Sequence, residues 1–237
     1  MSELFTPVST GRVSADIVEQ IKRAIYERKL SPGDQLPSER DLTKQLGVSR
    51  VSVRDALRML EANGLIEVRV GARGGAFVTA PPPDLVGEGM ANMLLLASVS
   101  PADVTELRLI FELALLPLAC ERRTGDDLRE LDDVCDRAEA SLKAGAYDVK
   151  LSAAFHTRLA ESTHNAAVGL FAESFQGPLL ESLRHAQRVA PEMGKAGLVE
   201  HRAIVDAVRA RDAGAARTIM GKHLERTARR VGGAAAR

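Results

Sequence analysis

The feature that most constrains this chain is a run of three prolines, Pro81, Pro82 and Pro83, between Ala80 and Asp84. Proline lacks a backbone N–H and has a fixed φ, so consecutive prolines interrupt helices and favour a stiff, extended connection. The 237 residues are enough for two ordinary domains. The sequence therefore predicts a division at the prolines, with a mixed helix and strand pattern before them and a helical pattern after them.

Composition narrows the classes of protein that fit. Hydrophobic residues make up 45% and charged residues 27% of the chain, which is typical of a folded protein with a packed core. Aromatic residues are only 3% and tryptophan is absent, which disfavours carbohydrate clefts and stacking platforms for single-stranded nucleic acid. The 32 basic and 32 acidic side chains cancel, so any DNA binding must depend on individually placed arginines.

The cysteines and the apolar segments indicate the compartment. Cys120 and Cys135 match neither a disulfide framework nor a zinc-ribbon spacing, so we expect buried free thiols in a reducing environment. The first residues lack the apolar core of a signal peptide, and the apolar clusters at 93–97 and 113–120 are too short to cross a bilayer. We therefore expect a cytoplasmic protein without membrane contact.

Residues before the prolines predict three helices followed by a β-hairpin. Apolar residues of helical spacing predict a helix over about 14–29, Ser38 caps a second helix that stops at Gly47, and Ser49 caps a third that ends at 63–64. Ile66, Val68 and Val70 alternate with charged residues, as in a half-buried strand, and glycine-rich residues 71–75 form a tip before a return strand at 76–79. Three helices and a hairpin predict a winged helix-turn-helix.

Residues after the prolines predict a mostly α fold, an antiparallel bundle of six or seven helices. Ser100 and Pro101 open a long helix to about residue 123. Gly125, Gly177 and similar breaks separate further helices at 126–143, 147–163, 166–175, 178–189, 197–211 and 213–231. The expected domains are a DNA-binding unit at 1–80, a linker and connecting helix at 81–99, an effector-binding and dimerisation domain at 100–232, and a tail at 233–237.

The helix after Ser49 carries Arg50, Arg54 and Arg58 at intervals of four, which forms a basic stripe beside its apolar face. A recognition helix enters the major groove N-terminus first, where an arginine fork matches guanine or phosphate, so Ser49, Arg50 and Arg54 are the residues expected to reach DNA. Arg40, and Arg73 with Gly74 at the wing tip, are expected to contact the backbone or the minor groove. The alternative is a merely solvated basic helix face.

The segment PGDQLPSERDLTKQLGVSRVSVRDALRMLEANGLI, with its glycine-rich wing, closely resembles the winged-helix domain of GntR-family transcriptional repressors. The resemblance covers about residues 12–79. It implies that five residues occupy DNA-contacting positions of the family: Arg40, Ser49, Arg50, Arg54 and Gly74.

Five histidines lie in the helical segment, and two of them are related by spacing. His201 lies 11 residues before residue 212, the middle of the last helix break, and His223 lies 11 residues after it (212 − 201 = 11; 223 − 212 = 11). In an antiparallel hairpin this places both at one level, about 16 Å from the turn at 1.5 Å per residue. Two facing imidazoles form half of a metal site, which a third ligand would complete.

The segments AAFHTRLAESTHN, VEHRAIVDAVRARD and MGKHLERT resemble the FadR-type ligand-sensing domain, abbreviated FCD, in its metal-binding form. The resemblance implies that His156, His201 and His223 bind a divalent metal such as zinc or nickel. The family's aspartate, four residues before the first histidine, is replaced here by Ser152, which is expected to orient a water or touch the effector. His164 and His185 match no ligand position and are expected to be structural.

The resemblance also places Arg108 where the family carries an arginine on the first long helix of the sensing domain. It implies recognition of a small carboxylate, and the alternative is an ion pair with Glu112 one turn away. We expect a homodimeric regulator, and not an enzyme, that binds a palindromic operator and responds to a small carboxylate. Two alternatives remain: a metal-free relative that takes a bulkier acyl ligand, and a metal-dependent hydrolase with a winged-helix module.

Overall fold

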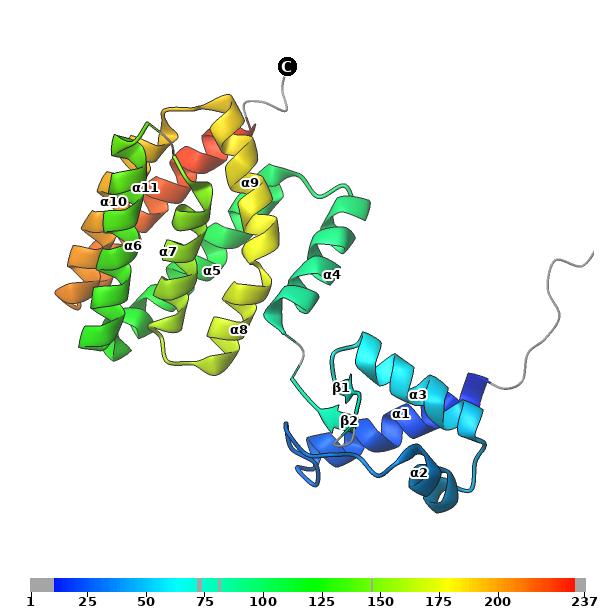
Figure 1. The fold of residues 1–237 in the computed structure, drawn as a ribbon. Coiled ribbons are helices and arrows are strands. Elements are labelled where there is room, and N and C mark those ends of the chain that lie inside the picture. The colour runs from blue at the N-terminus through cyan, green and yellow to red at the C-terminus, as the bar shows by residue number, and fades with distance from the viewer. Residues whose placement is uncertain (1–10, 72–73, 81, 146, 233–237) are drawn as a thin grey trace, which may run out of the picture. The chain divides into compact units, whose positions relative to one another are not determined.

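Figure 1 shows the computed structural model, which describes residues 11–71, 74–80, 82–145 and 147–232. The chain divides into two compact units, Met1–Pro82 and Pro83–Arg237. In its described part, the first unit contains three helices and a two-stranded hairpin, and the second is wholly helical. The predicted fold class, a winged helix-turn-helix followed by an all-α bundle, is confirmed.

The helices of the first unit are α1 (Gly11–Tyr26), α2 (Glu39–Leu46) and α3 (Arg50–Ala62). The caps are those that the sequence predicts: the Ser38 and Ser49 side chains accept hydrogen bonds from backbone N–H groups of α2 and α3, and Gly47 ends α2 in the left-handed region at φ 66°. The first helix lies about three residues earlier than predicted. The core of this unit joins apolar side chains of all three helices and the hairpin, among them Ile17, Ile21, Leu42, Val53, Leu57, Leu60, Ile66 and Val78.

The hairpin consists of β1 (Ile66–Arg69) and β2 (Gly75–Val78), which pair antiparallel with Ile66 opposite Val78. The prediction of a half-buried first strand is wrong beyond its first residue, because Val68 is 47% and Val70 is 95% exposed. Only Ile66 of β1 belongs to the core of this unit, and the apolar residues farther along the alternation, Val68 and Val70, are exposed.

The second unit begins with α4 (Pro83–Leu96), which lies against α8 and α9 of the bundle (Figure 1). Pro83 is the first residue of this helix, so the extended linker ends one residue before the proline run does. This start is compatible with proline because the first-turn N–H groups of a helix need no partner within the helix.

The bundle contains seven helices within the described residues of the second unit. Gly125 and Gly177, predicted as breaks, instead lie in the first turns of two of them. Thr124 caps the first of these helices with its side chain, whereas Phe175, which precedes the second, makes no side-chain cap hydrogen bond. The helices are α5 (Pro101–Arg122), α6 (Gly125–Lys143), α7 (Val149–Glu161), α8 (Ala166–Ser174), α9 (Gln176–Val189), α10 (Met193–Arg209) and α11 (Ala213–Gly232).

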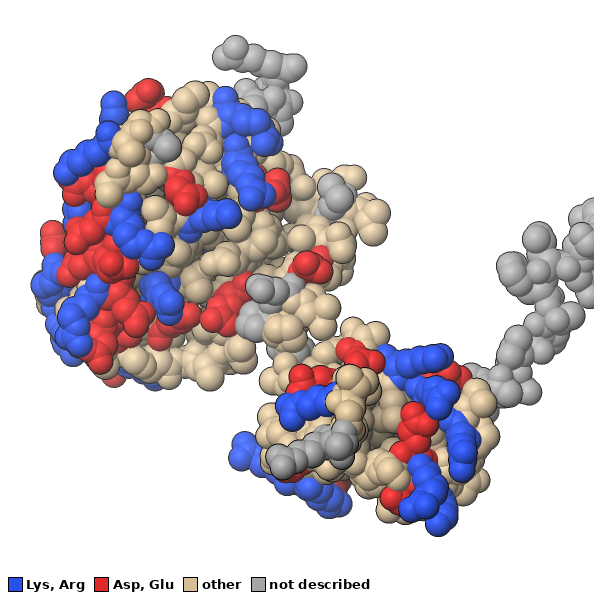
Figure 2. Space-filling view, in the orientation of Figure 1, with Lys and Arg blue, Asp and Glu red and all other residues tan. Residues whose placement is uncertain are grey.

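The bundle is stabilised by a large apolar core in which α5 packs on α11, and α10 packs on both α6 and α11. Phe155, Leu131 and Met220 are completely buried in this core, and burying one such side chain contributes about 1.5–3 kcal/mol. Basic and acidic side chains are interspersed over the surface of both units, as Figure 2 shows. No helix in the described part of the chain is both long and apolar enough to cross a membrane.

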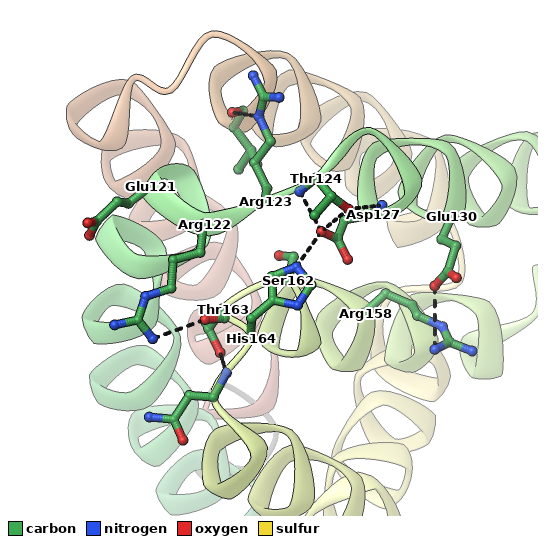
Figure 3. Close-up of polar contacts among 12 residues, drawn as sticks. Glu121, Arg122, Arg123, Thr124, Asp127, Glu130, Arg158, Ser162, Thr163 and His164 are labelled. Atoms are coloured by element: carbon green, nitrogen blue, oxygen red, sulfur yellow. Dashed lines mark hydrogen bonds and ion pairs between the residues drawn. The ribbon is translucent and has the colours of Figure 1, made fainter.

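At one end of the bundle, side chains form polar contacts with groups at the ends of helices (Figure 3). The Arg122 guanidinium donates to the Thr163 carbonyl at 3.3 Å, and His164 Nε2 lies 2.8 Å from an Asp127 carboxylate oxygen. The His164 side chain is nearly half exposed and that of Asp127 is 16% exposed. This contact therefore lies at the surface of the bundle, near a helix end.

Candidate metal centre and DNA-binding helix

Three exposed arginines that were predicted to contact DNA lie on α2 and in the first half of α3. The side chains of Arg40 and Arg54 are 71% and 60% exposed, and Arg50 is also exposed. Arg54 forms an ion pair with Glu39 of α2 at 3.2 Å. An exposed pair of this kind is worth about 0.2–1 kcal/mol, so Arg54 can exchange this partner for a phosphate or a base edge at little cost.

The wing carries a position that only glycine can occupy. A Cβ on Gly74 would lie 2.5 Å from the Arg69 carbonyl oxygen and 2.8 Å from that of Gly71. The Gly74 N–H donates to the Gly71 carbonyl, and its own carbonyl accepts from Gln35 Nε2 at 3.1 Å. The wing is therefore tied to the segment before α2. Arg73, predicted to contact DNA from the same tip, lies outside the described residues.

Three helices of the second unit bring His156, His201 and His223 together. They come from α7, α10 and α11, and each is at most 5% exposed. The ring centroids of His201 and His223 are 4.8 Å apart, and those of His156 lie 5.1 Å and 5.4 Å from them. One ligand atom from each lies within 4.8 Å of the others, so the equal spacing about residue 212 does bring two histidines to one level.

Carboxylates hold two of the rings in one orientation. His156 Nδ1 lies 2.5 Å from Glu112 Oε2, and His223 Nδ1 lies 2.6 Å from Glu200 Oε2. Because an ionised carboxylate only accepts hydrogen bonds, Nδ1 of each ring carries the proton and Nε2 keeps its lone pair. His201 stacks on Phe155 at a centroid distance of 4.0 Å. Within the described part of the chain, His156 Nε2 and His201 Nε2 are buried without a hydrogen-bond partner.

Burial keeps these rings neutral. It lowers the pKa of His156 and of His223 to about 4, and it lowers that of His201 well below the ordinary value. For Glu112 burial acts in the opposite direction, but His156 and Arg108 outweigh it and lower the pKa of this carboxyl to about 2. At neutral pH the cluster therefore presents neutral imidazoles beside an ionised carboxylate, the state in which histidines bind metals.

The donor set fits a divalent transition metal. Imidazole nitrogens suit zinc and nickel, and a carboxylate on the far ring nitrogen is the usual support of a metal-binding histidine. Zinc lies about 2.0–2.1 Å from such nitrogens, which places two tetrahedral ligand atoms about 3.4 Å apart. Ligand atoms that are up to 4.8 Å apart here would therefore have to move closer together around an ion. The partnerless Nε2 atoms, which cost free energy as they stand, are the observation that such an ion would account for.

Arg108 forms the ion pair that was the alternative interpretation, while carboxylate binding at this residue stays a prediction. It is 2% exposed, and its Nε donates to Glu112 Oε1 at 2.9 Å, as expected for an ion pair one turn apart. Its terminal nitrogens, Nη1 and Nη2, are buried and have no hydrogen-bond partner among the described residues. These two nitrogens form the fork that binds a carboxylate with two parallel hydrogen bonds.

Ser152 fills the aspartate position with a neutral hydroxyl. Its side chain is 4% exposed, and it forms a hydrogen bond with the Tyr147 hydroxyl, whose pKa is raised by burial. The Tyr147 ring lies directly on Gly194 of α10, where an added Cβ would be 2.4 Å from a ring carbon. The position therefore holds two bonded hydroxyl groups in place of a negative charge.

Two polar partners of the cluster residues, Glu200 and Tyr147, were not predicted from the sequence. Glu200 directly precedes His201 but contacts His223 of the next helix, and Tyr147 lies in the loop before α7. The only sequence signal for Glu200 was its position beside the candidate ligand His201. The sequence offered no signal for Tyr147.

A small cavity of about 20 Å³ lies beside His156. Arg108, Glu112 and Thr157 form its polar wall, and the remaining lining is apolar: Leu107, Phe111, Phe171, Ala172, Phe175 and Leu179. A space of this size holds about one water molecule, so the structure shows this site in a closed form.

The chain matches known families over both units. The model of the gntR family of bacterial regulatory proteins matches residues 13–78, and the FCD domain model matches residues 103–226. The HTH-type transcriptional repressor NanR of Cronobacter sakazakii is 33% identical over 229 residues, which cover 92% of this chain and 85% of that protein. NanR of Citrobacter rodentium is 32% identical over 226 residues, with the same coverage. A solved structure of a GntR protein from Streptococcus agalactiae superposes with a TM-score of 0.68 at 26% identity, covering 91% of this chain and 99% of that one.

Proposed function

Because this chain belongs to the GntR family of bacterial regulatory proteins and carries an FCD domain, we propose that it represses transcription under the control of a small carboxylate. The NanR relatives are named as transcriptional repressors, which places this chain among regulators and not enzymes. The hydrolase alternative is therefore set aside. We place the protein in the cytoplasm, where its operator is.

The DNA-binding half of the proposal rests on α3. Its N-terminus, with Ser49, Arg50 and Arg54, would enter the major groove, while Arg40 of α2 would hold a phosphate and Gly74 would bring the wing backbone close to DNA. A single winged domain covers only about 600–1,000 Å² of DNA interface. We therefore propose that two copies bind a palindromic operator as a symmetric dimer.

The observation that carries the effector half is the set of buried polar atoms left without partners. Among the described residues, those at the histidine cluster and its adjoining cavity are His156 Nε2, His201 Nε2 and the two terminal nitrogens of Arg108. Each buried group of this kind costs about 1–3 kcal/mol when unpaired, and more when charged. A site that binds both a metal and a carboxylate would give every one of them a partner.

We propose that His156, His201 and His223 hold zinc or a similar ion, which when bound supplies a positive charge for an anionic ligand. The Arg108 fork would bind the carboxylate, and Glu112 would orient both Arg108 and His156 through its two oxygens. Ser152 and Tyr147 would offer hydroxyl groups to the ligand. Because Ser152 replaces the aspartate, no carboxylate from this position would reduce the positive charge of the metal, and the attraction between the metal and an anion would be stronger.

The same observation weighs against the metal-free alternative. An acyl ligand bound without a metal would have no use for three converging imidazoles, whose ligand atoms lie within 4.8 Å of one another. Effector binding can change operator affinity only as far as it favours one arrangement of the two DNA-binding units in the dimer. The proposal therefore predicts that DNA affinity depends on occupancy of the histidine cluster.

The test is fluorescence anisotropy of the full chain on duplexes from the DNA upstream of its own gene, with and without zinc and a set of small carboxylic acids. We expect salt-dependent binding to one palindromic duplex and a change in affinity with at least one acid. His201→Ala should keep DNA binding and lose that response, whereas His185→Ala, at a partly exposed histidine outside the cluster, should keep both. Binding that ignores sequence, or a response that survives in His201→Ala, would contradict the proposal.

A further inference from the structure

The cavity beside His156 has walls of two kinds. Its polar wall is formed by Arg108, Glu112, His156 and Thr157. Of these, Thr157 already donates its hydroxyl to the Ala153 carbonyl at 3.3 Å, and Glu112 is bonded to both Arg108 and His156. The groups left to recognise a ligand are therefore the Arg108 fork, which suits a carboxylate directly, and His156 Nε2, whose lone pair could reach a carboxylate only through a bound metal ion.

The opposite wall offers no polar side chain. It consists of Leu107, Phe111, Phe171, Ala172, Phe175 and Leu179. A ligand with many hydroxyl groups would bury them against this wall without hydrogen-bond partners, which is unfavourable. A ligand with an apolar body would instead remove apolar surface from water and pack on the aromatic rings.

The wall must also open, because the cavity of about 20 Å³ is smaller than any organic acid. Leu107 and Phe171 are the exposed members of the lining, at 39% and 37%, so they lie at its outer edge. Phe171 packs on Phe111 with ring centroids 4.8 Å apart. It belongs to α8, a helix of nine residues of which Ser174 is the buried one. Phe171 also stacks on Phe175 at 6.0 Å, so movement of this ring at the outer edge would open the site along its aromatic wall.

We propose that the effector is a carboxylate with a compact apolar body, such as an aromatic or branched aliphatic acid, and that it enters by displacing Phe171. This inference rests on the proposed function, since the carboxylate would be held by Arg108 and the metal-binding histidines. It goes further by excluding sugar acids and other polyhydroxylated acids as the preferred class.

The test is isothermal titration of the zinc-loaded full chain with phenylacetate and with gluconate, a polyhydroxylated acid of similar size. We expect phenylacetate to bind about tenfold more tightly or better, the order of discrimination that a hydrophobic pocket achieves. Leu107→Asn should weaken phenylacetate about tenfold, whereas Ile110→Asn, on an exposed residue of the same helix that does not line the cavity, should not. Gluconate binding as tightly as phenylacetate would overturn the inference.

The entry route is tested by stopped-flow binding of phenylacetate. Phe171→Ala should raise the association rate, because no ring has to move, while Leu170→Ala, at an exposed neighbour on α8 outside the lining, should leave it unchanged. Equal rates for Phe171→Ala and wild type would overturn the route. If zinc alone fails to bind, the proposed function fails as well; if zinc binds and phenylacetate does not, only this inference fails.

Discussion

At the scale of single residues, the proposed effector site rests on polar atoms that are buried without a partner among the described residues. Three histidines could be chosen from the sequence, His156 by its local motif and His201 with His223 by equal distance from a turn. The carboxylates that orient these rings could not be predicted, because Glu112 and Glu200 contact histidines on other helices. Contacts between helices depend on how the helices pack, which a single sequence does not specify.

Ser152 provides a prediction at this scale. Ser152→Asp adds a carboxylate to a buried cluster of neutral imidazoles, so zinc affinity should rise by about tenfold or more, and affinity for an anionic ligand should fall because the added charge competes for the same ion. Equilibrium dialysis with zinc, followed by titration with phenylacetate, measures both. Ser152→Ala is the control and should leave zinc binding near the wild-type level. Weaker zinc binding in Ser152→Asp would contradict the placement of this residue beside the metal.

At the scale of elements, local signals predicted the helix ends of the first unit well. Ser38, Gly47 and Ser49 act as caps because capping depends on bonds within a few residues. The burial of β1 was predicted less well. Alternation along a strand does not indicate how far other elements pack against it, and Val70 is exposed. Gly125 and Gly177 were interpreted as breaks but lie in the first turns of helices, where the backbone N–H groups need no partner within the helix.

The DNA-binding helix gives the prediction at this scale. Arg54→Ala should cost about 1–3 kcal/mol of operator affinity and relax base preference, if Arg54 reads a base edge. Arg40→Ala, at the position proposed to bind a phosphate, should weaken all duplexes alike and reduce the salt slope by about 1. Anisotropy titrations at several salt concentrations measure both effects.

Arg58→Ala is the matched control for these variants, because Arg58 lies one turn farther from the start of α3 and pairs with Asp55. All three arginines are exposed, so each variant should fold. Wild-type operator binding by both Arg54→Ala and Arg40→Ala would show that α3 does not dock in the major groove.

At the scale of the whole molecule, the proline run predicted the division of the chain, because consecutive prolines cannot continue a helix or strand and Pro83 is tolerated only as the first residue of the next helix. The packing of α5 on α11 and the closed cavity between α5, α7, α8 and α9 were not predictable. Both arise from the fit of side chains of different helices, and helix periodicity alone leaves the partner of each apolar face open.

Dimer formation is the prediction for the assembled protein. Sedimentation velocity at micromolar concentration should show a two-chain species, because symmetric homodimers match palindromic operators and one winged domain offers too little interface alone. The same sample bound to operator should contain two chains per duplex. A monomer that binds the palindrome with full affinity would contradict the dimer.

The central claim, that the helical unit senses its effector through a metal at three histidines, is tested most directly by metal content. Protein purified without chelators or a nickel column should carry about one zinc or similar ion per chain by elemental mass spectrometry, since the site offers one set of converging ligands. His201→Ala should lose this metal, whereas His185→Ala should retain it. Wild-type protein that stays free of metal after dialysis against micromolar zinc, or His201→Ala that binds as much as wild type, would contradict the account.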